Sequence, residues 1–215
     1  MPHGAAGTCA PGCARSGLQY VGMERPDTEM TRRVEEAASA LLRIADDARE
    51  RFGGLTLEQL AWRPDPGSWS VAQCFDHLVR SHSDYLPRFR ALADGTARPT
   101  LWERASPFSG LLGRVLVRSL SPENPRKTRT ARRMDPAAGE VDGREVERFA
   151  EHQRELVASL RALPADLDPR RVVVTSPFSP LVTYSLADCL QVIVAHCRRR
   201  FRQSERVTAA PGFPR

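Results

Sequence analysis

Residues 184–207 read YSLADCLQVIVAHCRRRFRQSERV, and their spacing decides the fold of the chain. Apolar side chains recur every three or four residues, which is the period of one face of an α-helix. Ser185 is followed three residues later by Asp188, an arrangement typical of a helix N-cap. We therefore expect a helix from Ser185 to about Thr208. His196 and Arg200 lie four residues apart on its apolar stripe, so both side chains should point into the protein.

Three further segments repeat apolar residues with the same period. They span residues 27–52, 71–94 and 143–163. Ser70 and Gln73 form a capping box before the second segment, and Pro87 should kink or divide that segment. Four amphipathic helices without sustained strand alternation predict an all-α protein, a four-helix bundle.

The connection between the second and third helices is long. Residues 95–142 are rich in Pro, Gly and Arg, and only residues 108–120 have an apolar pattern that predicts one short helix. The arginines of residues 126–133 are expected to form a solvated surface.

The bundle domain is expected to span residues 27–209. Residues 1–26 are predicted to be a disordered tail, with Met23 or Met30 as an alternative start, and residues 210–215 are predicted to be a loose C-terminal tail.

The composition indicates a soluble globular protein. The chain has 41% hydrophobic and 27% charged residues, and it lacks an apolar run of the roughly 18–20 residues that a membrane helix needs. The net charge of +6 is almost entirely arginine, because Lys127 is the only lysine. This bias is typical of a bacterial gene with GC-rich codons, so we do not expect nucleic acid as a partner. Five cysteines without an export signal predict reduced thiols in the cytoplasm.

Histidines on facing helices are the strongest chemical signal. His77 lies at the edge of the inward stripe of residues 71–94, and His196 lies on the inward stripe of the last helix. Two such imidazoles can hold Zn²⁺ or Ni²⁺, but a catalytic zinc normally has three protein ligands. Arg200 cannot be the third, because a guanidinium has no lone pair to donate and stays protonated.

Two motifs resemble the DinB-like superfamily of four-helix bundles, which includes YfiT-like metal-dependent hydrolases and thiol-dependent S-transferases. One is LTLEQLAWRPDPGSWSVAQCFDHL, with the family's Trp-x-Pro, its Trp-Ser cap and a helix that carries His-Leu. The other is SPFSPLVTYSLADCLQVIVAHCRRRFRQSERV, which is similar to the family's last helix. The resemblance covers roughly residues 27–209, apart from much of 95–142, and implies the same fold.

The resemblance also implies a metal site with one ligand replaced. The family binds a divalent metal through three histidines, of which His77 and His196 match two. Arg199 matches an arginine that often precedes the third histidine, Arg200 stands at the position of that histidine, and Gln203 follows.

The residues leave open what Arg200 does. His82 lies about 140° further round the helix than His77 and should not reach the same metal, and His152 on the third helix is a possible outside ligand. Arg200 either pairs inside the bundle with a carboxylate, for which Asp76 is the candidate, or binds an anionic ligand in the former metal pocket.

Two functions follow from these alternatives. The first is a metal-dependent enzyme, a thiol S-transferase or hydrolase that acts on a small electrophile. The second is a non-catalytic bundle that has lost its metal and binds a small molecule or a protein. A homodimer is a further expectation from the resemblance.

Overall fold

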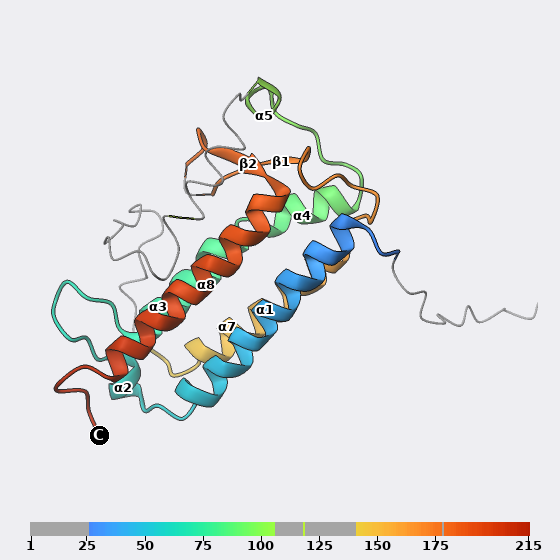
Figure 1. The fold of residues 1–215 in the computed structure, drawn as a ribbon. Helices are drawn as coiled ribbons and strands as arrows, with labels where there is room; N and C mark the ends of the chain where they lie inside the picture. Colours follow the sequence, from blue (N-terminus) through green and yellow to red (C-terminus); the bar gives the residue numbers. More distant parts are fainter. Residues whose placement is uncertain (1–25, 106–117, 119–140, 178) are drawn as a thin grey trace, which may run out of the picture.

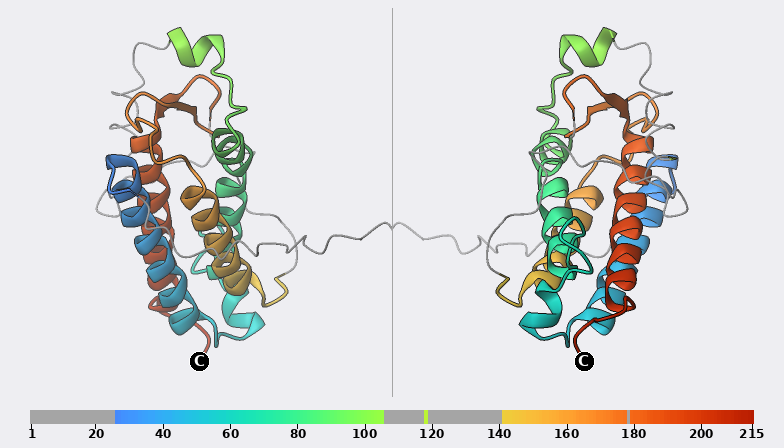
Figure 2. Two further views of the ribbon diagram at one scale, coloured as in Figure 1. Left: turned by 90° about the vertical axis from the view of Figure 1, so that its right-hand side faces the viewer. Right: turned by 90° about the vertical axis from the view of Figure 1, so that its left-hand side faces the viewer.

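The computed structural model describes residues 26–105, 118, 141–177 and 179–215. Four helices form the bundle, and each begins or ends where the sequence places a cap or a break. They are α1 (Glu29–Phe52), α3 (Val71–Ser83), α7 (Glu145–Arg161) and α8 (Leu186–Thr208). Helix α1 contacts α7 and α8, and α3 contacts the same two helices, so α1 and α3 lie on opposite corners of the bundle (Figures 1 and 2). The all-α prediction is confirmed.

Local capping explains where α3 begins and ends. The hydroxyl of Ser70 accepts a hydrogen bond from the backbone N–H of Gln73, whose side chain returns a bond to the backbone N–H of Ser70. The helix ends at Ser83, and α4 (Leu86–Ala93) starts with Pro87 in its first turn. The predicted division of this segment at Pro87 is therefore confirmed. The capping box at Ser70 fixes where α3 starts, and thus which of its side chains point inward.

The end of the bundle that holds the start of α8 carries a short helix and two short strands. They are α5 (Leu101–Ala105) and an antiparallel pair of strands, β1 (Val173–Thr175) with β2 (Thr183–Ser185), in the register Val174 to Tyr184. Strands of three residues are too short to show alternation in a sequence, which is why the prediction contained none. The predicted short helix over 108–120 and the arginines of 126–133 lie outside the described residues, except Arg118.

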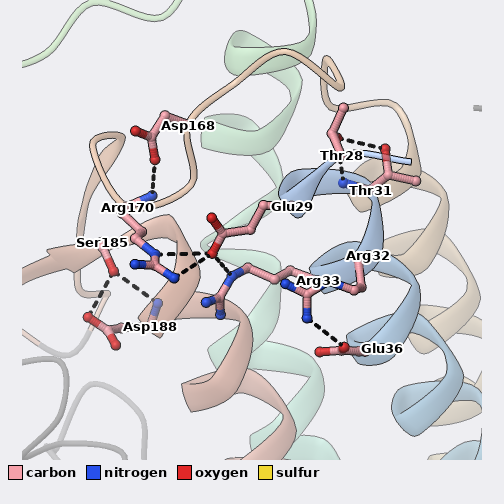
Figure 3. Close-up of polar contacts among 10 residues, drawn as sticks. All are labelled: Thr28, Glu29, Thr31, Arg32, Arg33, Glu36, Asp168, Arg170, Ser185 and Asp188. Atoms are coloured by element: carbon pink, nitrogen blue, oxygen red, sulfur yellow. Dashed lines mark hydrogen bonds and ion pairs between the residues drawn. The ribbon is translucent and has the colours of Figure 1, made fainter. Parts of the chain in front are cut away.

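At this end, side-chain contacts tie α1 to the loop that precedes the strands. Glu29 accepts hydrogen bonds from Arg33, one turn along α1, and from Arg170 (Figure 3). Ser185 caps α8 by accepting from the backbone N–H of Asp188, as the sequence predicts (Figure 3).

The opposite end is closed by α2 (Leu57–Ala61) and the last residues of the chain (Figure 1). The ring of Phe213 packs edge-on against Trp62 with centroids 5.5 Å apart, and Gln59 donates a hydrogen bond to the carbonyl of Pro214. The residues expected to form a loose tail are thus docked onto α2. Among the described helices, none is long and apolar enough to cross a membrane.

Candidate functional site

His77 and His196 meet inside the bundle, where α3 packs against α8. Both side chains are buried. Their Nε2 atoms lie 3.0 Å apart, and the two rings are nearly perpendicular with centroids separated by 4.9 Å. The sequence predicted that these two residues belong to one site, and the geometry brings them into direct contact.

Arg200 lies one turn beyond His196 and reaches the same point. Its Nη2 atom is 3.4 Å from Nε2 of His77, and its Nη1 atom donates a 2.7 Å hydrogen bond to Oε1 of Gln203. The guanidinium carbon lies 4.1 Å from the centroid of the Trp69 ring, which also packs on the ring of His77 at 4.8 Å. Arg200 therefore fills the place beside the two histidines, with an aromatic face beneath its charge.

These contacts fix the protons on the two imidazoles. A guanidinium only donates, so Nε2 of His77 must accept from Arg200 and carries no hydrogen. Nε2 of His196 then carries the hydrogen that joins the two rings. The remaining hydrogen of His77 is on Nδ1, which lies 3.5 Å from the hydroxyl of Ser81. The lone pair that would bind a metal is already used by two N–H groups.

The donor set does not fit a three-ligand metal centre. In the part of the chain that the structure describes, no three His, Cys, Asp or Glu side chains converge to hold an ion. Among the described side chains, only two histidine nitrogens face this point, and the neighbouring position presents N–H groups of a cation, which would repel a dication. A metal would need Arg200 to withdraw and His196 to move its proton to Nδ1.

The surroundings of the site are electropositive. Burial, together with a smaller contribution from the charge of Arg199, lowers the pKa of Arg200 to about 10, so Arg200 remains protonated at neutral pH. Burial also holds the pKa of His196 well below its usual range, and His82, His77, Arg200 and Arg199 add to that effect. The candidate partner Asp76 forms a 2.8 Å ion pair with Arg80, one turn along α3. The site thus combines neutral imidazoles with a net positive field.

Further polar residues extend the site inward, and most of these were missed from the sequence. The ring of His82 lies 5.4 Å from that of His196 and 6.5 Å from that of His152. The thiol of Cys197 lies 3.9 Å from Nδ1 of His82 and donates to Oε1 of Gln153 at 3.7 Å. Trp69 was also missed as a site residue, because a tryptophan before a helix cap is expected to anchor a loop.

Comparisons with known proteins agree with this architecture. The family model of the DinB superfamily matches residues 40–204, so the chain belongs to the DinB superfamily. Among curated proteins, none matches the sequence.

A solved structure shows the same fold at low sequence identity. It is described as "YfiT from Bacillus subtilis is a probable metal-dependent hydrolase with an unusual four-helix bundle topology". The two chains are 16% identical, with a TM-score of 0.52 over 84% of this chain and 89% of the other. At this identity the likeness extends to the fold alone, and the activity of this chain has to be argued from its own residues.

Proposed function

We propose that this protein is a non-catalytic bundle that binds a small molecule carrying an anionic group, with Arg200 as the anchor. The observation that carries the proposal is the guanidinium of Arg200, which contacts His77 at 3.4 Å and lies on the face of Trp69. A fixed cation at this place favours an anion for the same electrostatic reason that it disfavours a metal.

The neighbouring residues support an anionic ligand. Gln203 orients the guanidinium through Nη1, and Trp69 holds it from one side, so the planar donor fork is preorganised. Arg199 adds a second positive charge, whose effect is seen in the lowered pKa of both Arg200 and His196. Trp69, Arg199 and Gln203 are partly exposed, whereas His77 and His196 are buried beneath them, so a ligand would approach from the side of these three residues.

Binding of inorganic phosphate tests the proposal. Phosphate should raise the unfolding free energy relative to chloride at equal ionic strength, by about 1.4 kcal/mol at ten times its dissociation constant. Arg200→Gln should abolish this effect. Arg202→Gln is the matched control, because it removes the same charge from an exposed position two residues along α8. Equal phosphate stabilisation of the wild type and Arg200→Gln would refute Arg200 as the anchor.

A second candidate is a metal-dependent enzyme, a hydrolase or a thiol S-transferase acting on a small electrophile. The observation that favours it is the 3.0 Å separation of the two Nε2 atoms, which is close to that of two neighbouring ligands on one ion. His77 and His196 would hold zinc or nickel, and such an ion would activate water or a thiol. This candidate requires a third donor in addition to the two histidines.

Metal content separates the two candidates. The protein would be purified without chelator after growth with zinc and nickel, and metal per chain would be counted by elemental analysis. The first candidate predicts no bound metal in the wild type and about one ion per chain in Arg200→His. Close to one ion per chain in the wild type would instead favour the enzyme.

A further inference from the structure

At the inner end of the site, three buried polar atoms lack a hydrogen-bond partner among the described residues. They are Nε2 of His82, Nδ1 of His152 and Nε2 of Gln153. The three side chains are 1%, 7% and 0% exposed, so bulk water does not satisfy them. An unsatisfied buried polar group costs about 1–3 kcal/mol, and folded proteins contain few of them. Three such atoms on neighbouring side chains therefore indicate that a further molecule forms hydrogen bonds with them.

The other nitrogen of His152 determines its tautomer. The hydroxyl of Ser83 donates its single hydrogen to the carbonyl of Val79 at 2.8 Å. The same hydroxyl lies 3.1 Å from Nε2 of His152, and it can only accept there. Nε2 of His152 therefore carries the hydrogen, and Nδ1 is a bare acceptor. Burial lowers the pKa of His152, which keeps the ring neutral.

The same reasoning applies to His82. Oε1 of Gln153 can only accept, so the thiol of Cys197 donates its hydrogen to that oxygen. The sulfur then accepts from Nδ1 of His82, which leaves Nε2 of His82 as a second bare acceptor. Among the described residues no acceptor lies within reach of a hydrogen on that nitrogen, which fits a neutral ring. Nε2 of Gln153 supplies N–H donors.

We propose that one ordered water molecule is bound between His82, His152 and Gln153. Two bare acceptors and one donor are the complement of a water molecule, which donates two hydrogens and accepts through its oxygen. The rings of His82 and His152 are 6.5 Å apart, whereas rings in direct contact in this site lie at 4.9 Å and 5.4 Å. The larger separation suits two hydrogen bonds of about 2.9 Å that meet at one oxygen.

A cation fits this place less well than water. The amide group of Gln153 presents N–H groups, because its oxygen is used by the thiol of Cys197. The water would join α3 to α7 and hold the ring of His82 in contact with His196. Its role is to keep the inner wall of the site in position, and it does not depend on which ligand binds at Arg200.

Histidine tautomers and water contacts in solution test the proposal. Proton–nitrogen correlation spectra of the ¹⁵N-labelled full-length protein at pH 7.5 should show hydrogen on Nδ1 of His82 and on Nε2 of His152. The ring protons of both residues should also show a cross-peak to a long-lived water. The opposite tautomer of either ring, or the absence of the water cross-peak, would overturn the proposal.

Variants separate a bound water from general hydration. Gln153→Leu should remove the water cross-peak, whereas Gln191→Leu, at an exposed position on α8, should retain it. A cross-peak that persists in folded Gln153→Leu would show that Gln153 does not bind the water. If Gln153→Leu fails to fold, the wild-type tautomers and cross-peak still decide the question. Because none of these readouts involves phosphate or metal, they can fail or succeed independently of the proposed function.

Discussion

The interior of the bundle contains two regions that are built from the same helices but have opposite chemistry. Toward the α2 end, four phenylalanines pack as a chain of rings, with Phe75 lying 5.5 Å from Phe52 and 4.9 Å from Phe149, and Phe201 lying 5.4 Å from Phe52. Toward the other end of α3, α7 and α8, the buried positions hold histidines and a glutamine, beside the half-buried Arg200. One region stabilises the fold by burying apolar surface, whereas the other removes polar groups from water.

The difference indicates where selection has acted for something other than stability. A bundle of this size could fill its whole interior with apolar side chains, as it does around Phe75. Polar groups that cost free energy are retained mainly where a site needs them. The comparison can be tested by changing each region in turn.

The largest effect is expected from the phenylalanine region. Phe75→Ala removes a fully buried ring that touches two others, and should lower the unfolding free energy by about 3–5 kcal/mol. Denaturant unfolding followed by circular dichroism measures the change. A loss below about 1 kcal/mol would show that this region does not carry the stability assigned to it.

Acid should act on the histidine region. The pKa values of His82, His152 and His196 are lowered by burial, so the native state keeps these rings neutral while the unfolded chain protonates them near pH 6.5. The contribution of the neutral rings to the unfolding free energy is complete above pH 6.5 and is lost as the pH falls below this value. The maximum slope is about 1.4 kcal/mol per pH unit for each ring, or about 4 for the three.

Unfolding titrations between pH 6.5 and 5 measure this slope. In the native state that window lies above the range where the carboxylates of Glu29 and Glu147, whose pKa values are lowered by Arg33 and Arg49, begin to protonate. His152→Gln should reduce the slope by about a third. A stability that is flat across the window would mean that the histidines are not held neutral in the native state.

Removal of the buried charge should have a smaller effect and the opposite sign. Arg200→Met keeps a long side chain on Trp69 but removes a cation whose burial lowers its pKa to about 10. We expect the unfolding free energy to be unchanged or to rise by about 1 kcal/mol, while any stabilisation by phosphate is lost. A decrease of more than 2 kcal/mol would show that Arg200 is a structural residue.

The sequence predicts the helices well because their signals are local. Ser70 with Gln73 and Ser185 with Asp188 mark the starts of α3 and α8, and Pro87 marks a break, each through contacts within a few residues. The prediction that His77 and His196 belong to one site followed from the phase of the two helices and from the family resemblance.

The inner half of the site could not be predicted in the same way. His82 lies about 140° round α3 from His77, which suggested a separate environment, yet α3 contacts both α7 and α8 and the ring of His82 reaches toward both. Which side-chain rotamer fills such a three-helix junction depends on packing that no short pattern encodes. The contact of Trp69 with Arg200 likewise joins residues far apart in sequence.

The smallest expected effect is the labelling of buried thiols in the native protein. Cys74 directly precedes Phe75 on α3, and burial raises its pKa to about 11. Cys197 lies among the histidines, and burial also raises its pKa, so a neighbouring imidazole does not activate it. In a variant with Cys9 and Cys13 changed to serine, a thiol reagent at pH 7.5 should label neither residue until the protein unfolds. Rapid native labelling of Cys197 but not Cys74 would mean that the histidine region opens to solvent separately, and would set it apart from the phenylalanine region in dynamics as well as in chemistry.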